Sequence, residues 1–195
     1  MKHEVTTLNT KRTLAASLKR LMQEKALSKI TVSEIVKECG VNRKTFYYHF
    51  EDIYSLLIWM FEQEAVGVVR QFDLLTDYDE AIAFVMDYVD NNQHILNCAF
   101  DFLGREGLKK FLYSDFIGIL RTTVDSIEEE LKISVSEDYK RFLCDFYAEA
   151  LAGMLIEWIR SPEKFERDKT LCYLSNILCT TLPQALCIEG KHADA

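Results

Sequence analysis

The sequence predicts an all-α protein, and two observations carry this prediction. Only 7 glycines and 2 prolines occur among the 195 residues, so few positions favour turns. Apolar residues recur at helical spacing through most of the chain, beginning with Leu14, Leu18, Leu21 and Met22. We expect an N-terminal region of three helices, residues 1–51, followed by a C-terminal helical bundle, residues 52–195.

The first helix is predicted over about residues 10–24. Residues 30–50 then read as two short helices joined by a tight turn. Thr31 is a suitable N-cap, and Glu34 three residues later completes a capping box. Gly40 ends the first helix of the pair by tolerating positive φ, and Asn42 can cap the second. This pattern predicts a helix-turn-helix.

The second helix of the pair carries groups that suit DNA. Phe46 and Phe50, four residues apart, anchor it to the domain. We expect Tyr47 to point at a duplex and Tyr48 to lie obliquely. The side chains left to face outward combine cations, hydroxyls and an imidazole, which suit a major groove and its phosphates; they are Arg43, Lys44, Thr45, Tyr47, Tyr48 and His49.

The charge distribution agrees with this interpretation. The overall formal charge is −8, but residues 1–50 hold 10 Lys and Arg against 4 Asp and Glu, which is a net charge of +6. The remaining residues hold 13 against 27, a net charge of −14. A basic segment joined to an acidic one is expected when only the first meets a polyanion. The sequence therefore predicts double-stranded DNA as a partner.

The C-terminal region reads as a series of further helices. They are expected over about residues 52–72, 79–91, 94–102, 105–132, 136–160 and 168–187. Pro183 should kink the last helix or end it early, and the tail 189–195 should be frayed.

Several classes of protein are not indicated. The chain lacks H-E-x-x-H, P-loop, G-x-S-x-G and G-x-G-x-x-G signals, so we expect neither an enzyme nor a cofactor. His94 and Cys98 lie four apart, but two ligands are too few for a metal site. We see no uncharged apolar run that would span a membrane and no signal core, and we expect a cytoplasmic protein that does not bind a membrane.

The C-terminal region offers a candidate ligand pocket and a candidate dimer interface. Aromatic or polar groups on apolar helices could line a small-molecule pocket, with Arg121 suited to an acidic ligand; the residues are Tyr88, His94, Phe116, Arg121 and Tyr147. Ordinary core packing, or an Arg121–Asp125 pair, would explain the same residues. Small and apolar residues on the last two long helices favour a homodimer; they are Ala152, Gly153, Leu155, Trp158 and Leu178.

The pattern T-V-x-E-I-V-x-x-C-G-V-N-R-K-T-F-Y-Y-H-F closely resembles the DNA-binding segment of the TetR family of bacterial transcriptional regulators, over about residues 8–61. The resemblance implies a homodimer that reads a near-palindromic operator and a ligand-responsive repressor that a small molecule releases. It places Arg43, Lys44 and Thr45 at bases and nearby backbone, and Thr31, Tyr47, Tyr48 and His49 at phosphates and thymine methyls.

Two residues depart from the family's pattern. Many members have Gly where Lys44 stands, so base preference could differ, and many have Lys where this chain has Ile53. The stretch through Trp59 is also similar to the branch that includes regulators of dihydroxyacetone kinase operons. That branch contains activators that bind a protein partner. An activator or adaptor working through a protein therefore remains the alternative to a repressor.

Overall fold

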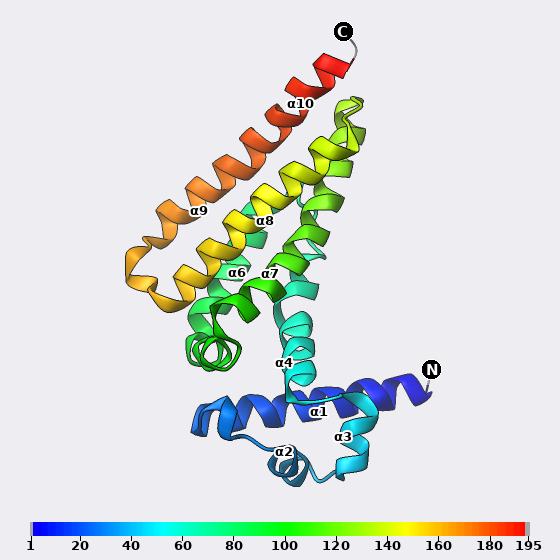
Figure 1. Ribbon diagram of the computed structural model, residues 1–195, viewed down its shortest axis with the longest axis vertical. Helices are drawn as coiled ribbons and strands as arrows, with labels where there is room; N and C mark the ends of the chain where they lie inside the picture. The colour runs from blue at the N-terminus through cyan, green and yellow to red at the C-terminus, as the bar shows by residue number, and fades with distance from the viewer. Residues whose placement is uncertain (1, 194–195) are drawn as a thin grey trace. The chain divides into compact units, whose positions relative to one another are not determined.

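Helix α1 (Lys2–Glu24) is the first element of the chain (Figure 1). The computed structural model describes the backbone of residues 2–193 and the side chains of residues 6–190. Every regular element in this part of the chain is helical, so the predicted fold class is confirmed. α1 begins eight residues before the predicted start at Thr10.

The chain divides into two compact units. The first, which we call the head, combines Met1–Gly67 with Asn92–Gly104; the second, the body, combines Val68–Asn91 with Arg105–Ala195. The predicted division into residues 1–51 and 52–195 stays a prediction.

The head contains the expected helix-turn-helix. Its elements after α1 are η1 (Leu27–Lys29), α2 (Val32–Glu38), α3 (Arg43–His49), α4 (Ile53–Phe61) and the π-helical turn η2 (Glu62–Val66). The core of the head is made of side chains with no exposed surface, namely Leu14, Leu18, Met22, Ile35, Phe46, Leu56 and Leu57. The apolar stripe predicted for the first helix therefore forms this core.

The start of α2 has the predicted capping box. The backbone N–H of Glu34 donates to Oγ1 of Thr31 at 3.3 Å, and the backbone N–H of Thr31 donates to Oε2 of Glu34 at 2.9 Å. Lys25, in the segment after α1, also bonds to the Glu34 carboxylate. These donors favour the charged carboxylate and lower the pKa of Glu34 to about 2, with the Lys25 hydrogen bond as the largest cause.

A short helix, α5 (Gly67–Val69), follows the head's first segment, and the body then begins its own helices. They are α6 (Tyr78–Asn91), the later part of α7 (Gln93–Leu131), α8 (Glu137–Arg160), η3 (Pro162–Lys164), α9 (Arg167–Asn176), η4 (Ile177–Thr181) and α10 (Leu182–Ala193). Gly104 lies inside α7 with φ of +70° and ψ of 171°, which is not helical. The predicted break between residues 102 and 105 is therefore confirmed.

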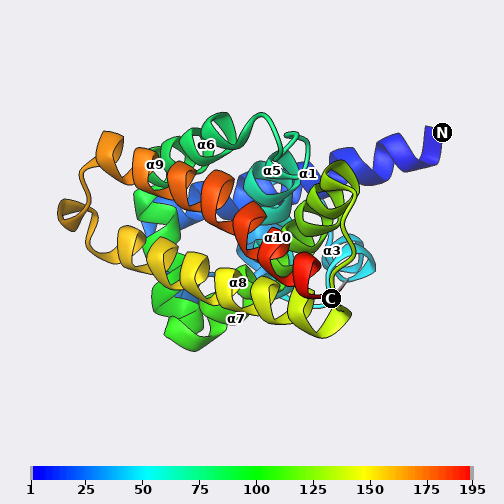
Figure 2. The same cartoon turned by 90° about the horizontal axis from the view of Figure 1, so that it is seen from above.

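The body packs its helices around a shared apolar core. Figures 1 and 2 both show α8 antiparallel to the segment formed by α9, η4 and α10. Leu120 and Val124 of α7, Ala148 of α8, and Leu182 and Leu186 of α10 are buried together in this core. These shared buried side chains join α7, α8 and α10 in one apolar core.

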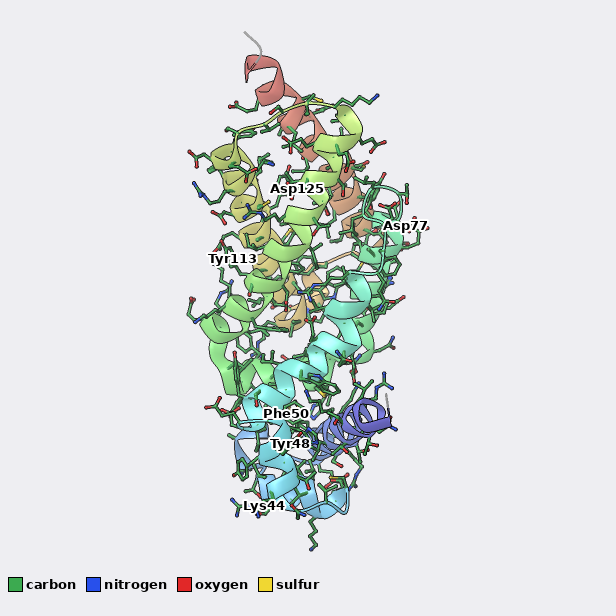
Figure 3. The ribbon with its side chains drawn as sticks, turned by 90° about the vertical axis from the view of Figure 1, so that its right-hand side faces the viewer. Lys44, Tyr48, Phe50, Asp77, Tyr113 and Asp125 are labelled. Atoms are coloured by element: carbon green, nitrogen blue, oxygen red, sulfur yellow. The ribbon has the colours of Figure 1, made fainter. Side chains whose placement is uncertain are left out.

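Polar contacts connect α7 to α8 and α9 to α6. Figure 3 labels Tyr113 on α7, and its hydroxyl donates to Oδ1 of Asp145 on α8 at 2.7 Å. Arg167, at the start of α9, donates to Asp87 at 2.6 Å and to Asp90 at 2.9 Å, both on α6. Such pairs fix the helix positions more than they add stability, because exposed ion pairs contribute little.

The end of the chain differs from the prediction. We expected Pro183 to kink or end the last helix and residues 189–195 to fray, but α10 continues to Ala193; Asp194 and Ala195 lie outside the described residues. Pro183 has no N–H for the carbonyl four residues earlier, which belongs to Cys179. That position lies in the π-helical turn Ile177–Thr181, where the wider helix accommodates the proline ring.

Residues Arg167–Gly190 form one helical stretch of 24 residues that is long and apolar enough, by length and composition, to cross a membrane. The sequence had led us to expect no such stretch. Its buried side chains, which include Leu182 and Leu186, belong to the core of the body. Length and composition alone are weak support for a membrane span.

The Glu34 contacts predict a specific acid sensitivity. Because the folded-state pKa of about 2 lies below the ordinary value of 4.5, Glu34 stabilises the fold above pH 4.5, and this contribution is lost as the pH falls toward 2. Glu34→Gln should therefore flatten the fall of the urea midpoint between these two pH values. Glu51→Gln, at an exposed acid near α3, is the control. An unchanged slope in Glu34→Gln would contradict the assignment.

Candidate functional site

The start of α3 is fixed by a tight turn and a cap. Gly40 has φ of +69°, and the N–H of Val41 donates to the carbonyl of Val36 at 3.0 Å, which closes the end of α2. Oδ1 of Asn42 then accepts the backbone N–H of Thr45 at 2.9 Å and the Thr45 hydroxyl at 3.2 Å. The turn and the N-cap are therefore those predicted from the sequence.

Two phenylalanines determine which face of α3 is buried. Phe46 has no exposed surface and Phe50 has 5% exposed, and their ring centroids lie 6.1 Å apart. The ring of Phe50 also contacts Trp59 of α4, with centroids 5.8 Å apart. Nζ of Lys11 on α1 lies 5.4 Å from the Phe50 centroid and 5.8 Å from that of Trp59, within the range of cation–π attraction.

The opposite face of α3 is open to solvent. Arg43 and Lys44 are exposed, Tyr47 is 51% exposed and Tyr48 is 72% exposed. We expected Tyr48 to lie obliquely, and its side chain is the more exposed of the two tyrosines. Successive helical residues are rotated by about 100°, so Tyr48 lies about 200° from the buried Phe46. Figure 3 labels Lys44 and Tyr48 in the head.

The remaining predicted DNA contacts differ in their surroundings. Thr31 is exposed at the start of α2, whereas Thr45 and His49 are half-buried. Burial, together with the nearby charge of Lys11, lowers the pKa of His49. The lowered pKa favours the neutral imidazole of His49 over the cation.

Charge on the face of α3 comes from Arg43 and Lys44. Nη2 of Arg43 donates to the Tyr47 hydroxyl at 3.4 Å, and the guanidinium lies 5.9 Å from the Tyr47 ring centroid. Within the described side chains Lys44 makes no ion pair, while Lys19 of α1 binds Glu64 at 2.6 Å. The cations of α3 are therefore available to an external anion.

The start of α4 is less suited to phosphate. Ile53, which stands where many TetR proteins have lysine, is half-buried, and the neighbouring Glu51 and Asp52 are exposed. Oδ1 of Asp52 accepts the backbone N–H of Ser55 at 2.7 Å, so this acid serves as the helix cap. The missing cation noted from the sequence has no substitute at this position.

The body contains a partly enclosed cavity of about 360 Å³ between α6, α7, α8 and the segment from α9 to α10. Of the five predicted ligand-binding residues, Phe116 is the one that lines it. The cavity walls are mainly aliphatic, as at Ile82, Met86, Leu120 and Leu178. A pocket of this size and lining is typical of small-molecule sites.

The other four predicted ligand residues lie elsewhere. Arg121 is exposed and donates to Oε2 of Glu137 at 3.2 Å, and Tyr88 is half-buried on α6 away from the lining. Tyr147 is buried, with its hydroxyl 2.7 Å from Oγ1 of Thr181. His94 belongs to the head, where its Nε2 lies 2.9 Å from the Met22 carbonyl. Arg121, Tyr147 and His94 therefore have partners within the chain, and all four residues lie outside the cavity lining.

The predicted dimer residues mostly face the interior of their own chain. Ala152 and Trp158 are buried, and Leu155, Trp158 and Leu178 line the cavity, while Gly153 is half-buried with open space beside its Cα. Other apolar side chains on the same helices are exposed: Phe142, Phe146, Tyr173, Ile177 and Ile188. We call these five residues the exposed apolar face. The four-residue spacing of Phe142 and Phe146, and of Tyr173 and Ile177, was visible in the sequence.

Comparison with known proteins gives two matches to families. Residues 14–58 match the family described as "Bacterial regulatory proteins, tetR family", and residues 76–178 match "Transcriptional regulator C-terminal region". The second match covers more than half of the chain. It includes α6, α8 and the part of α7 that belongs to the body, and these helices contribute to the cavity wall.

A curated relative and a solved structure extend this comparison. The chain is 24% identical over 158 residues to the "HTH-type dhaKLM operon transcriptional activator DhaS" of Lactococcus lactis subsp. lactis (strain IL1403), covering 81% of this chain and 83% of the relative. It resembles the solved "Dihydroxyacetone kinase operon activator DhaS" with a TM-score of 0.66 and 23% identity, over 93% of this chain and 98% of that one. At this identity the structural likeness concerns the fold. The capped, outward-facing α3 and the two family matches agree, and the chain belongs to the TetR family of bacterial transcriptional regulators.

Proposed function

We propose that this regulator binds a near-palindromic operator as a homodimer and acts as a repressor that a small molecule releases. The orientation of α3 is the observation that carries the proposal. Buried Phe46 leaves Arg43, Lys44 and Tyr47 facing outward on one short helix, which suits the major groove. Thr31, Thr45, Tyr48 and His49 complete the proposed contacts, and DNA binding rather than catalysis is the proposed activity, in the cytoplasm.

The exposed apolar face supports the homodimer. Phe142 and Phe146 of α8 stack with centroids 6.5 Å apart, and they are 61% and 59% exposed. Tyr173, Ile177 and Ile188 add apolar surface on the antiparallel segment. A large apolar patch of this kind usually marks an interface, and a second copy would cover it with the same residues through a two-fold axis. Two such helical layers would form a four-helix interface.

The cavity supports control by a small molecule. It lies wholly within the body, and the chain passes from body to head after Asn91 and from head to body after Gly104. A ligand that binds only one arrangement of the body would change the population of DNA-binding dimers. Effector control by this route is the proposed use of the cavity.

Activation through a protein partner is the second candidate. The printed title of the relative from Lactococcus lactis describes a transcriptional activator, which favours this sign of regulation. Purified protein added to transcription from its own upstream region separates the two candidates. Less transcript supports repression, and more transcript, or more only with a cell-derived protein fraction, supports activation.

Binding to DNA is tested by fluorescence anisotropy with the upstream region and a scrambled duplex across a salt series. Specific binding should weaken steeply as salt rises, because phosphate neutralisation releases counterions. Equal affinity for both duplexes at every salt concentration would contradict the proposed operator recognition.

Lys44→Ala should reduce the preference for one base position. A direct base contact is worth about 1–3 kcal/mol, and its loss relaxes discrimination at that position alone. Binding to a set of single-substitution operators measures the change. Lys110→Ala, at an exposed lysine of the body, is the matched control. A uniform loss over all operators, with a salt slope lower by about 1, would instead assign Lys44 to a phosphate.

Tyr47→Phe should weaken operator binding by about 0.5–1.5 kcal/mol, because it removes one hydroxyl and keeps the ring. Anisotropy titration at fixed salt measures the change. Tyr139→Phe, on α8 of the body, removes a hydroxyl outside the head and should leave affinity unchanged. Wild-type affinity in Tyr47→Phe would place this hydroxyl outside the interface.

Phe146→Arg should convert dimers into monomers, because a charge on the exposed apolar face would be buried without a partner in the interface. Sedimentation velocity over a concentration series measures the dimer affinity. Phe102→Arg replaces a phenylalanine of the head that is 41% exposed, and it should leave the dimer intact. A Phe146→Arg protein that stays dimeric at unchanged affinity would exclude this face as the interface.

A further inference from the structure

Two polar side chains of the cavity wall, those of Thr123 and Trp158, are bonded to groups of the protein itself. Oγ1 of Thr123 donates to the carbonyl of Ile119 at 3.0 Å, and Nε1 of Trp158 donates to Oδ1 of Asp90 at 3.3 Å. The lining also holds Tyr78 and Cys179, and Sγ of Cys179 lies 3.7 Å from Oγ1 of Thr180. A ligand rich in hydroxyl groups would lose its bonds to water here and find few replacements.

The cavity also lacks a cation. Its lining contains one charged residue, Glu130, which is exposed and therefore lies at the edge of the cavity. Within the described residues Glu130 makes no ion pair or hydrogen bond. Arg121, the cation that the sequence offered for an acidic ligand, is paired with Glu137 outside the lining. A carboxylate in the cavity would be desolvated beside an acid of the same charge.

From the size of the cavity we estimate the size of its occupant. One water molecule occupies about 30 Å³ in the liquid. The cavity volume of about 360 Å³ therefore corresponds to about twelve water molecules. An aliphatic chain of about ten carbons with one small polar end fits this estimate. The aliphatic walls stabilise such a chain by removing its surface from water.

We propose that the cavity binds an amphiphile with an aliphatic body and a single amine end, which lies against Glu130, and that it rejects the corresponding carboxylate. This inference rests on the proposed small-molecule control and names the chemical class of the effector. The amine is selected by the unpaired carboxylate of Glu130 at the edge, and the aliphatic body is selected by the mainly aliphatic walls.

Three probes with the same ten-carbon chain test the proposal: decylamine, decanol and decanoate. Isothermal titration at pH 7, below the concentration at which the probes aggregate, should rank their affinities in that order. Decanoate should bind at least about tenfold more weakly than decylamine, because it places a like charge near Glu130. Decanoate binding as tightly as decylamine, or none of the probes binding, would overturn the proposal.

Variants assign the selectivity to one residue. Glu130→Gln should remove most of the difference between decylamine and decanol, whereas Glu129→Gln, at the exposed neighbour outside the lining, should preserve it. A Glu130→Gln protein that keeps the full amine preference would contradict the role of this carboxylate. Both substitutions lie at exposed positions, and a matching thermal unfolding profile confirms that the variants are folded.

Operator binding is measured with the same protein preparations, so that failure of this inference can be distinguished from failure of the proposed function. If the probes fail to bind while the operator is bound specifically, the ligand class is wrong and DNA recognition stands. If decylamine binds and the operator is not recognised, the ligand class is supported and the proposed DNA-binding function fails.

Discussion

The burial of Phe46 and Phe50 is the constraint on which the candidate DNA interface depends. These two rings fix the rotation of α3 about its own axis, and the outward positions of Lys44, Tyr47 and Tyr48 follow from helical geometry. A helix of seven residues would not be stable alone, so tertiary anchoring has to hold it. Every polar contact proposed for α3 therefore relies on apolar packing behind it.

The local structure of the head could be predicted because its signals act over short distances. The Thr31 capping box, the Gly40 turn and the Asn42 cap each involve partners within five residues, so the sequence alone identifies them. The place of Lys11 above Phe50 and Trp59 could not be predicted, since it depends on how α1 packs against distant helices. The burial of Phe46 was predicted from its spacing to Phe50, whereas the 72% exposure of Tyr48 was not predicted from the sequence.

The body shows why helices are easier to predict than their faces. α8 has one apolar stripe through Leu143 and Ala148 and another through Phe142 and Phe146, and periodicity does not say which one is inside. The choice depends on α10, far along the chain, where Leu182 and Leu186 join the first stripe. Arg121 was misjudged for the same reason, because its partner Glu137 belongs to the next helix.

The composition of the head has a consequence for synthesis on the ribosome. Its last segment, Asn92–Gly104, comes after Val68–Asn91, which belongs to the body, and His94 of that segment reaches the Met22 carbonyl. The nascent head therefore stays incomplete until more than half of the polypeptide has been translated. During that interval the surface of α1 that receives this segment is uncovered, so the apolar core of the head is completed only after part of the body has been made.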